Sequence, residues 1–268
     1  MVGMRRRLWL LGPLWAAASL AVLAPEAQAK KAACPDGMTL VEGRYCIDTY
    51  EAAVVEVTGK GKSRPHPYYL SVKDLRVKAV SKKGVYPQGY ISRTEAAAAC
   101  ANAGKRLCRA EEWLRACEGS EGRRYPYGST LRKGACNSAK AHVMQALFGA
   151  DMSIYTFDLH YNSPKLNQQR GFLARAGEHA DCATPEGVMD LVGNLHEWVA
   201  DDVNHRFRKL LAARKMDLDV IESATDGNGA FLGGYYSSRE QHGTGCGYIT
   251  PAHEPAYHDY STGFRCCR

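Results

Sequence analysis

Residues 187–198 read Gly-Val-Met-Asp-Leu-Val-Gly-Asn-Leu-His-Glu-Trp, the most informative stretch of the chain. Its two carboxylates, Asp190 and Glu197, flank Gly193-Asn194, a pair of residue types that favours a tight turn. Carboxylate and carbonyl oxygens are the ligands that Ca²⁺ prefers. The residues alone leave two interpretations open: a calcium-binding loop, or a loop in which the carboxylates only cap turns.

Two helices are predicted upstream of this stretch. Residues 92–95 (Ser-Arg-Thr-Glu) form a capping box ahead of an alanine-rich segment, and Gly104 is placed to end that helix. Residues 109–117 carry apolar side chains at helical spacing, so one face of this second helix can pack on a core. A third helix is possible at 207–216.

Strand signals are strongest near the beginning of the chain. Residues 38–57 contain short runs of β-branched and aromatic residues interrupted by Gly43, which predicts an opening hairpin within residues 34–57. After Glu118, Gly, Tyr, Asn and Asp recur, so we expect irregular structure with short strands. The pattern favours an α+β protein with little regular secondary structure.

The first 29 residues have the features of an export signal. Arg5, Arg6 and Arg7 precede an apolar run at 8–23, and Ala27-Gln28-Ala29 is a small-x-small cleavage site. The apolar run contains Gly12-Pro13 and is shorter than the roughly 20 residues that a membrane span needs. We therefore expect cleavage after Ala29, a periplasmic or secreted protein, and no stable membrane insertion after cleavage.

Composition favours one folded domain at residues 30–268. The 268 residues are 45% hydrophobic and 24% charged, which is enough for a sizeable core. The formal charge is +7, and loss of residues 1–29, with three Arg and one Glu, leaves +5. There is no block of five like charges, so nucleic-acid binding is not expected.

The ten cysteines all lie after the predicted cleavage site. An even number in an exported chain predicts five disulfides, and no Cys-x2-Cys pair supports a zinc site. Cys34 and Cys46 are close enough in sequence to staple the opening hairpin.

Five sequence blocks follow one another in an order that resembles the sulfatase-modifying factor family, the formylglycine-generating enzymes. They are Gly-Lys-Arg-Leu at 104–107, Tyr-Pro-Tyr-Gly at 125–128, the stretch at 187–198, Gly-Gly-Tyr at 233–235 and Gly-Phe-Arg-Cys at 263–266. The resemblance spans residues 90–268. It implies a variant of the C-type lectin fold, mixed α+β and tied by disulfides, with chain ends close together.

The resemblance also implies particular site residues. The calcium ligands would be the side chains of Asp190 and Glu197 and the carbonyls of Gly193 and Leu195, with Asn137 beginning a second calcium site. Two disulfides would be Cys100–Cys266 and Cys117–Cys246. The partners of Cys108, Cys136, Cys182 and Cys267 stay open.

Catalysis is where the chain departs from the family it resembles. Formylglycine-generating enzymes oxidise a substrate cysteine with two cysteines that bind copper(I), a soft metal suited to thiolates. Residues 235–245 contain no cysteine; Ser238 falls at the first catalytic position and the second falls within 241–243. The resemblance therefore implies neither copper binding nor the family reaction for this chain.

Two classes of function remain. The first is a non-catalytic binding or structural module, in which a groove lined by Tyr235, Tyr236, Ser238, His242 and Tyr248 binds a protein segment or another ligand. The second is an oxidoreductase that oxidises a protein cysteine at a rearranged metal centre. The tyrosines are equally compatible with ordinary packing, and the histidines near the carboxyl end are more typical of surface loops than of a metal site.

Overall fold

The computed structural model describes residues 33–216, 219–222 and 224–268, together with Met1 and Gly3. The chain divides into two units, 1–31 and 32–268, and the second is described below. The predicted export signal lies outside the described residues. No helix among the described residues is long and apolar enough to cross a membrane.

The first sheet joins the beginning of the unit to its end. β1 (Met38–Val41) and β2 (Tyr45–Asp48) form an antiparallel hairpin with Met38 opposite Asp48. β11 (Cys266–Cys267) pairs with β2 on one side and with β6 (Arg106–Leu107) on the other. The two ends of the domain therefore lie side by side, as the resemblance implied.

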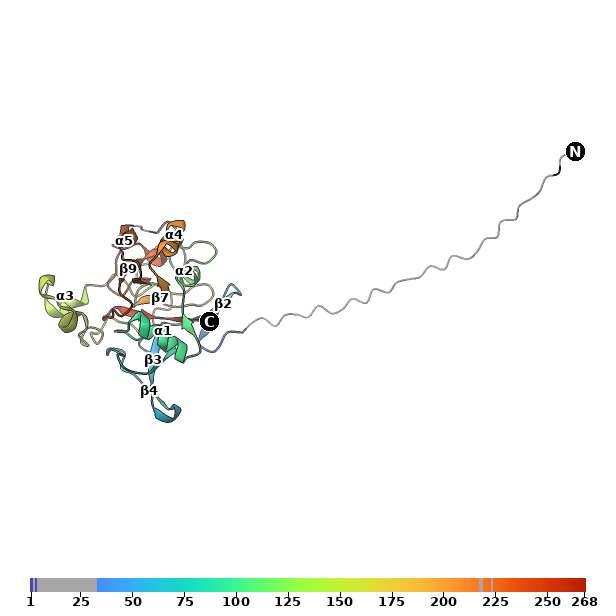
Figure 1. The fold of residues 1–268 in the computed structure, drawn as a ribbon. Coiled ribbons are helices and arrows are strands. Elements are labelled where there is room, and N and C mark those ends of the chain that lie inside the picture. Colours follow the sequence, from blue (N-terminus) through green and yellow to red (C-terminus); the bar gives the residue numbers. More distant parts are fainter. Residues whose placement is uncertain (2, 4–32, 217–218, 223) are drawn as a thin grey trace. The chain divides into compact units, whose positions relative to one another are not determined.

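The second sheet carries the most informative stretch. Its strand order is β10 (Thr262–Phe264), β7 (His196–Asp202), β8 (Gly229–Leu232) and β9 (Ile249–His253). β10 runs parallel to β7, whereas the other pairs are antiparallel. Figure 1 shows β7 and β9 in the middle of the domain.

The third sheet corrects the prediction of one hairpin across residues 34–57. β3 (Ala52–Val57) leaves the first hairpin and pairs with β4 (Ser63–Pro65), after the turn η1 (Gly59–Gly61), and with β5 (Val77–Ser81). Val54 is buried with alanines of the first helix, so this strand packs against that helix and not in the first sheet.

The two helices predicted upstream are present. α1 (Arg93–Asn102) begins at a capping box in which Glu95 N donates to Ser92 Oγ at 3.3 Å and Ser92 N donates to Glu95 Oε2 at 2.8 Å. α2 (Ala110–Glu118) turns an apolar face inward. The other helical elements are α3 (Val143–Phe148), η2 (Met152–Ile154), the π turn η3 (Phe157–Tyr161), α4 (His205–Ala213), α5 (Asp219–Glu222) and η4 (Gly245–Gly247).

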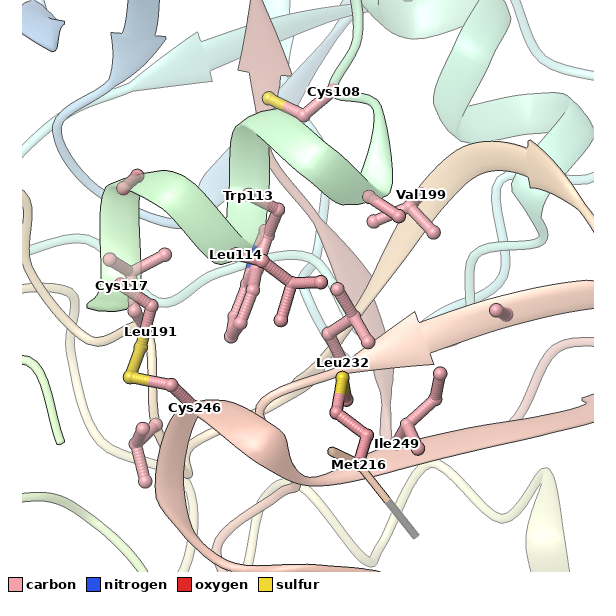
Figure 2. Close-up of a cluster of buried hydrophobic side chains, with 14 of the residues drawn as sticks. Cys108, Trp113, Leu114, Cys117, Leu191, Val199, Met216, Leu232, Cys246 and Ile249 are labelled. Atoms are coloured by element: carbon pink, nitrogen blue, oxygen red, sulfur yellow. A yellow bond between two sulfur atoms is a disulfide. The ribbon is translucent and has the colours of Figure 1, made fainter. Parts of the chain in front are cut away.

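Two tryptophans anchor two separate parts of the core. Trp113 on α2 is fully buried among aliphatic side chains from α2, β8 and β9, including Leu232 and Ile249 (Figure 2). Trp198 on β7 is buried in the cluster under α1, and its Nε1 donates to Ile91 O at 3.0 Å. Both tryptophans therefore serve the core.

All ten cysteines form disulfides. The pairs are Cys34–Cys46, Cys100–Cys266, Cys108–Cys267, Cys117–Cys246 and Cys136–Cys182. Three of these are the pairs expected above, and the other two assign the four cysteines that the sequence left open. Figure 2 shows Cys117 of α2 bonded to Cys246, next to Leu191.

Candidate functional site

The turn at the centre of the most informative stretch is held by Asn194. Gly193 and Asn194 have φ values of 82° and 60°, the left-handed region that Gly and Asn tolerate best. The buried Asn194 Oδ1 accepts from Ala174 N at 2.9 Å and from Asn137 Nδ2 at 2.7 Å, and its Nδ2 donates to a Glu51 oxygen. The asparagine is therefore required for packing within the turn.

Glu51 is a buried site residue that has no signal in the sequence. Besides Asn194, its carboxyl accepts from Leu195 N at 3.0 Å, although the two residues lie 144 positions apart. Burial, followed by the nearby charges of Asp190 and Glu197, raises the pKa of Glu51 well above its usual value. Burial therefore disfavours the ionised form of this carboxyl.

Glu197 is neutralised by a buried ion pair. Arg265 Nε donates to Glu197 Oε2 and Arg265 Nη2 to Glu197 Oε1, both at 2.5 Å, and Trp113 Nε1 donates to Glu197 Oε2 at 2.6 Å. Arg265 also donates to Asp48 O and Met189 O. The guanidinium thereby ties β7 to β2 and to the chain before the turn.

The predicted calcium ligands Asp190 and Glu197 do not fit an ion as they are arranged. Both oxygens of Glu197 already accept charged or indole donors, and a cation there would have to displace Arg265. Asp190 Oδ2 accepts from Gly177 N at 2.6 Å, and burial raises the pKa of Asp190 to about 6. Strong calcium ligation needs free carboxylate oxygens, so the block is better explained here as a polar core. Calcium binding by Asp190, Glu197 and the Gly193 and Leu195 carbonyls therefore remains a prediction of the resemblance alone, and the contacts of Glu197 and Asp190 do not favour it.

Asn137, the first residue of the second predicted calcium site, has one free acceptor. Its Nδ2 donates to Phe172 O at 2.9 Å and to Asn194, whereas its Oδ1 is buried without a hydrogen-bond partner. Lys140 Nζ donates to Gly171 O at 2.6 Å and to Phe172 O at 2.8 Å, so an ammonium group already lies at these carbonyls. This Oδ1 atom is therefore free to accept a cation.

Ser238 lines a small pocket next to the turn. The pocket has a volume of about 140 Å³, and Val192, Tyr248 and Tyr125 also line it. Ser238 Oγ accepts from Tyr235 N at 2.9 Å, and a hydrogen bond with Ser238 opposes the burial that raises the pKa of Tyr248. Neither partner is a general base, so Ser238 is not arranged as an activated nucleophile.

The groove expected from the sequence is only partly formed. Tyr235 and Tyr236 do not line the Ser238 pocket: they are 8% and 0% exposed, and Tyr236 donates to Asn167 Oδ1 at 3.0 Å. Tyr235 packs edge-on against Tyr260. These two groove residues are thus core residues, because burial of a tyrosine is decided by its contacts and not by its place in the sequence.

His242 also lies outside the pocket lining and packs edge-on against Tyr248 at 5.7 Å between ring centroids. Its Nδ1 is buried without a hydrogen-bond partner. Over the part of the chain that the structure describes, no three His, Cys, Asp or Glu side chains are grouped so that they could hold a metal ion.

The sequence profile described as "Sulfatase-modifying factor enzyme 1-like domain" matches residues 46–268. The chain therefore belongs to this family, which the five blocks indicated. Among curated proteins, none matches the sequence.

Solved structures with a similar arrangement include the Major Tropism Determinant P3c variant, with 15% identity and a TM-score of 0.43, covering 87% of this chain and 52% of that one. A structure described as CarF has 14% identity and a TM-score of 0.45, covering 84% and 85%. The chain spans about half the length of the Major Tropism Determinant variants. The mixed α+β class, with short strands, few helices and several disulfides, is confirmed by the elements described above.

Proposed function

We propose that this chain is a non-catalytic member of the sulfatase-modifying factor family that serves as a binding or structural module. The observation that carries the proposal is the state of the cysteines: all ten are paired, and none among the described residues is free. A copper(I) dithiolate needs two thiolates. At the position of the first catalytic cysteine the chain has Ser238, a hydroxyl engaged by a backbone amide.

The direct test is an oxidation assay. The full chain is incubated with a Cys-x-Pro-x-Arg peptide, copper and oxygen, and the peptide is analysed by mass spectrometry for the aldehyde. We expect no conversion above a no-enzyme control. Conversion that survives thiol alkylation of the chain would contradict the proposal and would point to the alternative, oxidation at a rearranged metal centre.

Introducing two cysteines tests whether the chain has lost only the catalytic thiols or also the geometry that binds copper(I). We expect Ser238→Cys combined with His242→Cys or with Gln241→Cys to gain copper(I) binding. Gly243→Cys is a poor choice, because a Cβ at residue 243 would collide with Gly247 O. Ser237→Cys with His242→Cys is the matched control, because Ser237 Oγ donates to Ala141 O and not toward the pocket residues.

The size of the Ser238 pocket bears on what it binds. Ligand pockets for whole small molecules usually measure roughly 300–1,000 Å³, and this one measures about 140 Å³. It suits one side chain or one chemical group of a larger ligand, which supports a protein segment as the partner. Ser238→Phe would fill it and is expected to abolish such binding without unfolding the chain, which circular dichroism checks.

Export is part of the proposal. Five disulfides are stable in an oxidising compartment and unusual in a reducing one. Intact-mass analysis of the protein recovered from its natural host should give a chain that begins at Lys30. A mass that retains residues 1–29 would contradict cleavage after Ala29.

A further inference from the structure

Exposed apolar side chains gather on one segment that does not line the Ser238 pocket. Met152, Ile154, Phe157 and Leu159 are 46%, 55%, 43% and 73% exposed. Among the described residues, the other large apolar side chains that are exposed, apart from Met1, are Leu70, Leu75 and Leu131, which lie elsewhere in the sequence. Scattered exposed apolar residues are normal, whereas four of them within residues 152–159 indicate an interaction surface.

This segment presents its side chains from a fixed backbone. The rings of Tyr155 and His160 stack at 5.2 Å, and Thr156 N donates to His160 Nδ1 at 3.0 Å. Asp151 Oδ1 accepts from Ser153 N at 3.0 Å, and the Tyr155 hydroxyl donates to Gly149 O. Figure 1 shows α3 and the yellow-green turns that follow it at the edge of the domain. A surface that is ordered before binding loses less conformational entropy when a partner binds.

Phe157 connects these side chains to a hollow of about 500 Å³. Its ring lies 5.5 Å from that of Tyr257, which stacks on His253 at 3.8 Å. The hollow is also lined by Thr225, Asn228, Ala256 and the exposed Glu254. We call the four exposed apolar residues and this hollow the Phe157 face.

The charge of the Phe157 face is opposite to that of the chain. Neither 141–164 nor 253–264, which supply most of the face, contains a Lys or Arg, whereas the chain as a whole has a formal charge of +7. Asp151, Asp158 and Glu254 are the exposed carboxylates of these two segments, and Asp259 is buried. The two segments lie side by side, because Tyr260 N donates to Tyr161 O at 3.1 Å. Among the residues that line the hollow, Glu254 is the one that carries a carboxylate.

We propose that the Phe157 face binds a peptide segment of a partner protein in which a Lys or Arg adjoins bulky apolar residues. The apolar side chains would pack on Ile154, Phe157 and Leu159, and the cation would lie by Glu254 at the aromatic edge of the hollow. Arg and Lys are attracted both by a carboxylate and by aromatic ring faces. A lipid surface suits the face less well, because attraction to anionic headgroups requires Lys or Arg.

This inference goes beyond the function proposed above and does not depend on it. The residues that line the Ser238 pocket and those that line the hollow do not overlap. A variant that blocks one surface should therefore leave binding at the other unchanged, and the two proposals can fail separately.

The test begins with selection of a random peptide library, displayed on phage, against the immobilised full chain. Selected peptides are synthesised with a fluorescent label, and their dissociation constants are measured by fluorescence anisotropy. We expect enrichment of Lys or Arg next to apolar residues and weaker binding at high salt. No enrichment, or enrichment of acidic peptides, would overturn the proposal.

Variants then locate the site. Phe157→Ser should weaken binding about tenfold or more, as expected for a central aromatic contact, and Glu254→Gln should weaken it and reduce the salt dependence. Leu75→Ser is the matched control, because Leu75 and Phe157 are both 43% exposed and Leu75 lies outside the hollow. Ser238→Ala should also leave the dissociation constant unchanged. Equal binding by wild type and Phe157→Ser would overturn the proposal.

The same variants also test two other binding partners for the Phe157 face, a second copy of this chain and a lipid surface. A concentration-dependent dimer in analytical ultracentrifugation that Phe157→Ser abolishes would assign the face to a second copy of this chain. Binding to vesicles of phosphatidylcholine and phosphatidylglycerol that the same variant abolishes would assign it to lipid. Either result would overturn the peptide proposal.

Discussion

Arg265 and Glu197 form a bidentate ion pair in which both nitrogen–oxygen distances are 2.5 Å. The two side chains are 0% and 1% exposed. Glu197 lies in β7 and Arg265 directly precedes β11, so the pair links the second sheet to the first. Each charge depends on the other, because neither has water to solvate it.

Breaking this pair from one side should be costly. We expect Arg265→Met to lower the free energy of unfolding by about 3–5 kcal/mol, since it leaves Glu197 buried without its cation. Arg265→Lys should cost less but still be destabilising, because an ammonium cannot form both bonds. Urea denaturation measures the effect. Arg106→Lys is the control: Arg106 pairs with Glu112 but is 43% exposed, and about 1 kcal/mol or less is expected. If Arg265→Met unfolds at the wild-type urea concentration, the pair does not stabilise the fold.

Gly193 should tolerate no side chain. A Cβ there would collide with Asn137 O, and the residue has a φ of 82°. Gly187 also has a positive φ, 92°, but nothing lies within 4 Å of its added Cβ. Gly187→Ala should therefore cost about 1–2 kcal/mol for the left-handed backbone alone, and Gly193→Ala roughly 1–3 kcal/mol more for the overlap. Equal thermal unfolding of the two variants would mean that the turn relaxes freely.

The disulfides should account for all thiols. Under denaturing, non-reducing conditions, titration with a thiol reagent should detect none. Two or more free thiols per chain would contradict the five pairs. Replacing Cys100 and Cys266 by Ala opens a connection between residues 166 positions apart, compared with 12 for Cys34 and Cys46. Because Cys108–Cys267 still joins the same two segments in that variant, the loop that is opened has only about ten residues, and the chain-entropy model gives a loss of about 3 kcal/mol for either pair, which guanidinium denaturation compares.

The buried His253 should make the free energy of unfolding fall at acidic pH. Burial lowers the pKa of His253 below its usual 6.5. The unfolded chain therefore takes up a proton at this histidine near pH 6.5, while the folded chain does not. The stabilisation is fully present above pH 6.5 and is lost as the pH falls through the pKa of His253 in the folded state. His253→Phe keeps a ring between Phe231 and Tyr257 and should reduce the loss. Parallel pH profiles of the urea midpoint for wild type and variant would contradict this.

Calcium removal should leave the protein unchanged if the arrangement of Glu197 holds in solution. We expect the same melting temperature with excess EGTA and with millimolar calcium, because Arg265 already balances the carboxylate that calcium would need. A rise in melting temperature with calcium that Asp190→Ala abolishes would restore the predicted site at 190–197. A rise that Asn137→Ala abolishes instead would place the ion at the free Oδ1.

Local signals in the sequence were enough for several elements. The capping box at Ser92 and the spacing in 109–117 predicted α1 and α2 to within one or two residues, because such signals act over one helical turn. The third helix was expected at 207–216 and lies at His205–Ala213. Gly193-Asn194 predicted a turn for the same local reason.

The partners of the turn could not be predicted in that way. Glu51 reaches Asn194 across 143 positions and Arg265 reaches Glu197 across 68. No periodicity encodes contacts of such separation. Packing between distant segments also decides that β3 joins the third sheet and that Tyr235 and Tyr236 are buried. Two of the disulfides could be predicted only through the family resemblance.

The adjacent residues Cys266 and Cys267 are bonded to Cys100 in α1 and to Cys108 in the connection between α1 and α2. Both bonds have to wait until the ribosome has made the whole domain, because their carboxyl-terminal halves are among its last residues. A domain truncated before residue 266 would leave Cys100 and Cys108 as a pair of unbonded thiols.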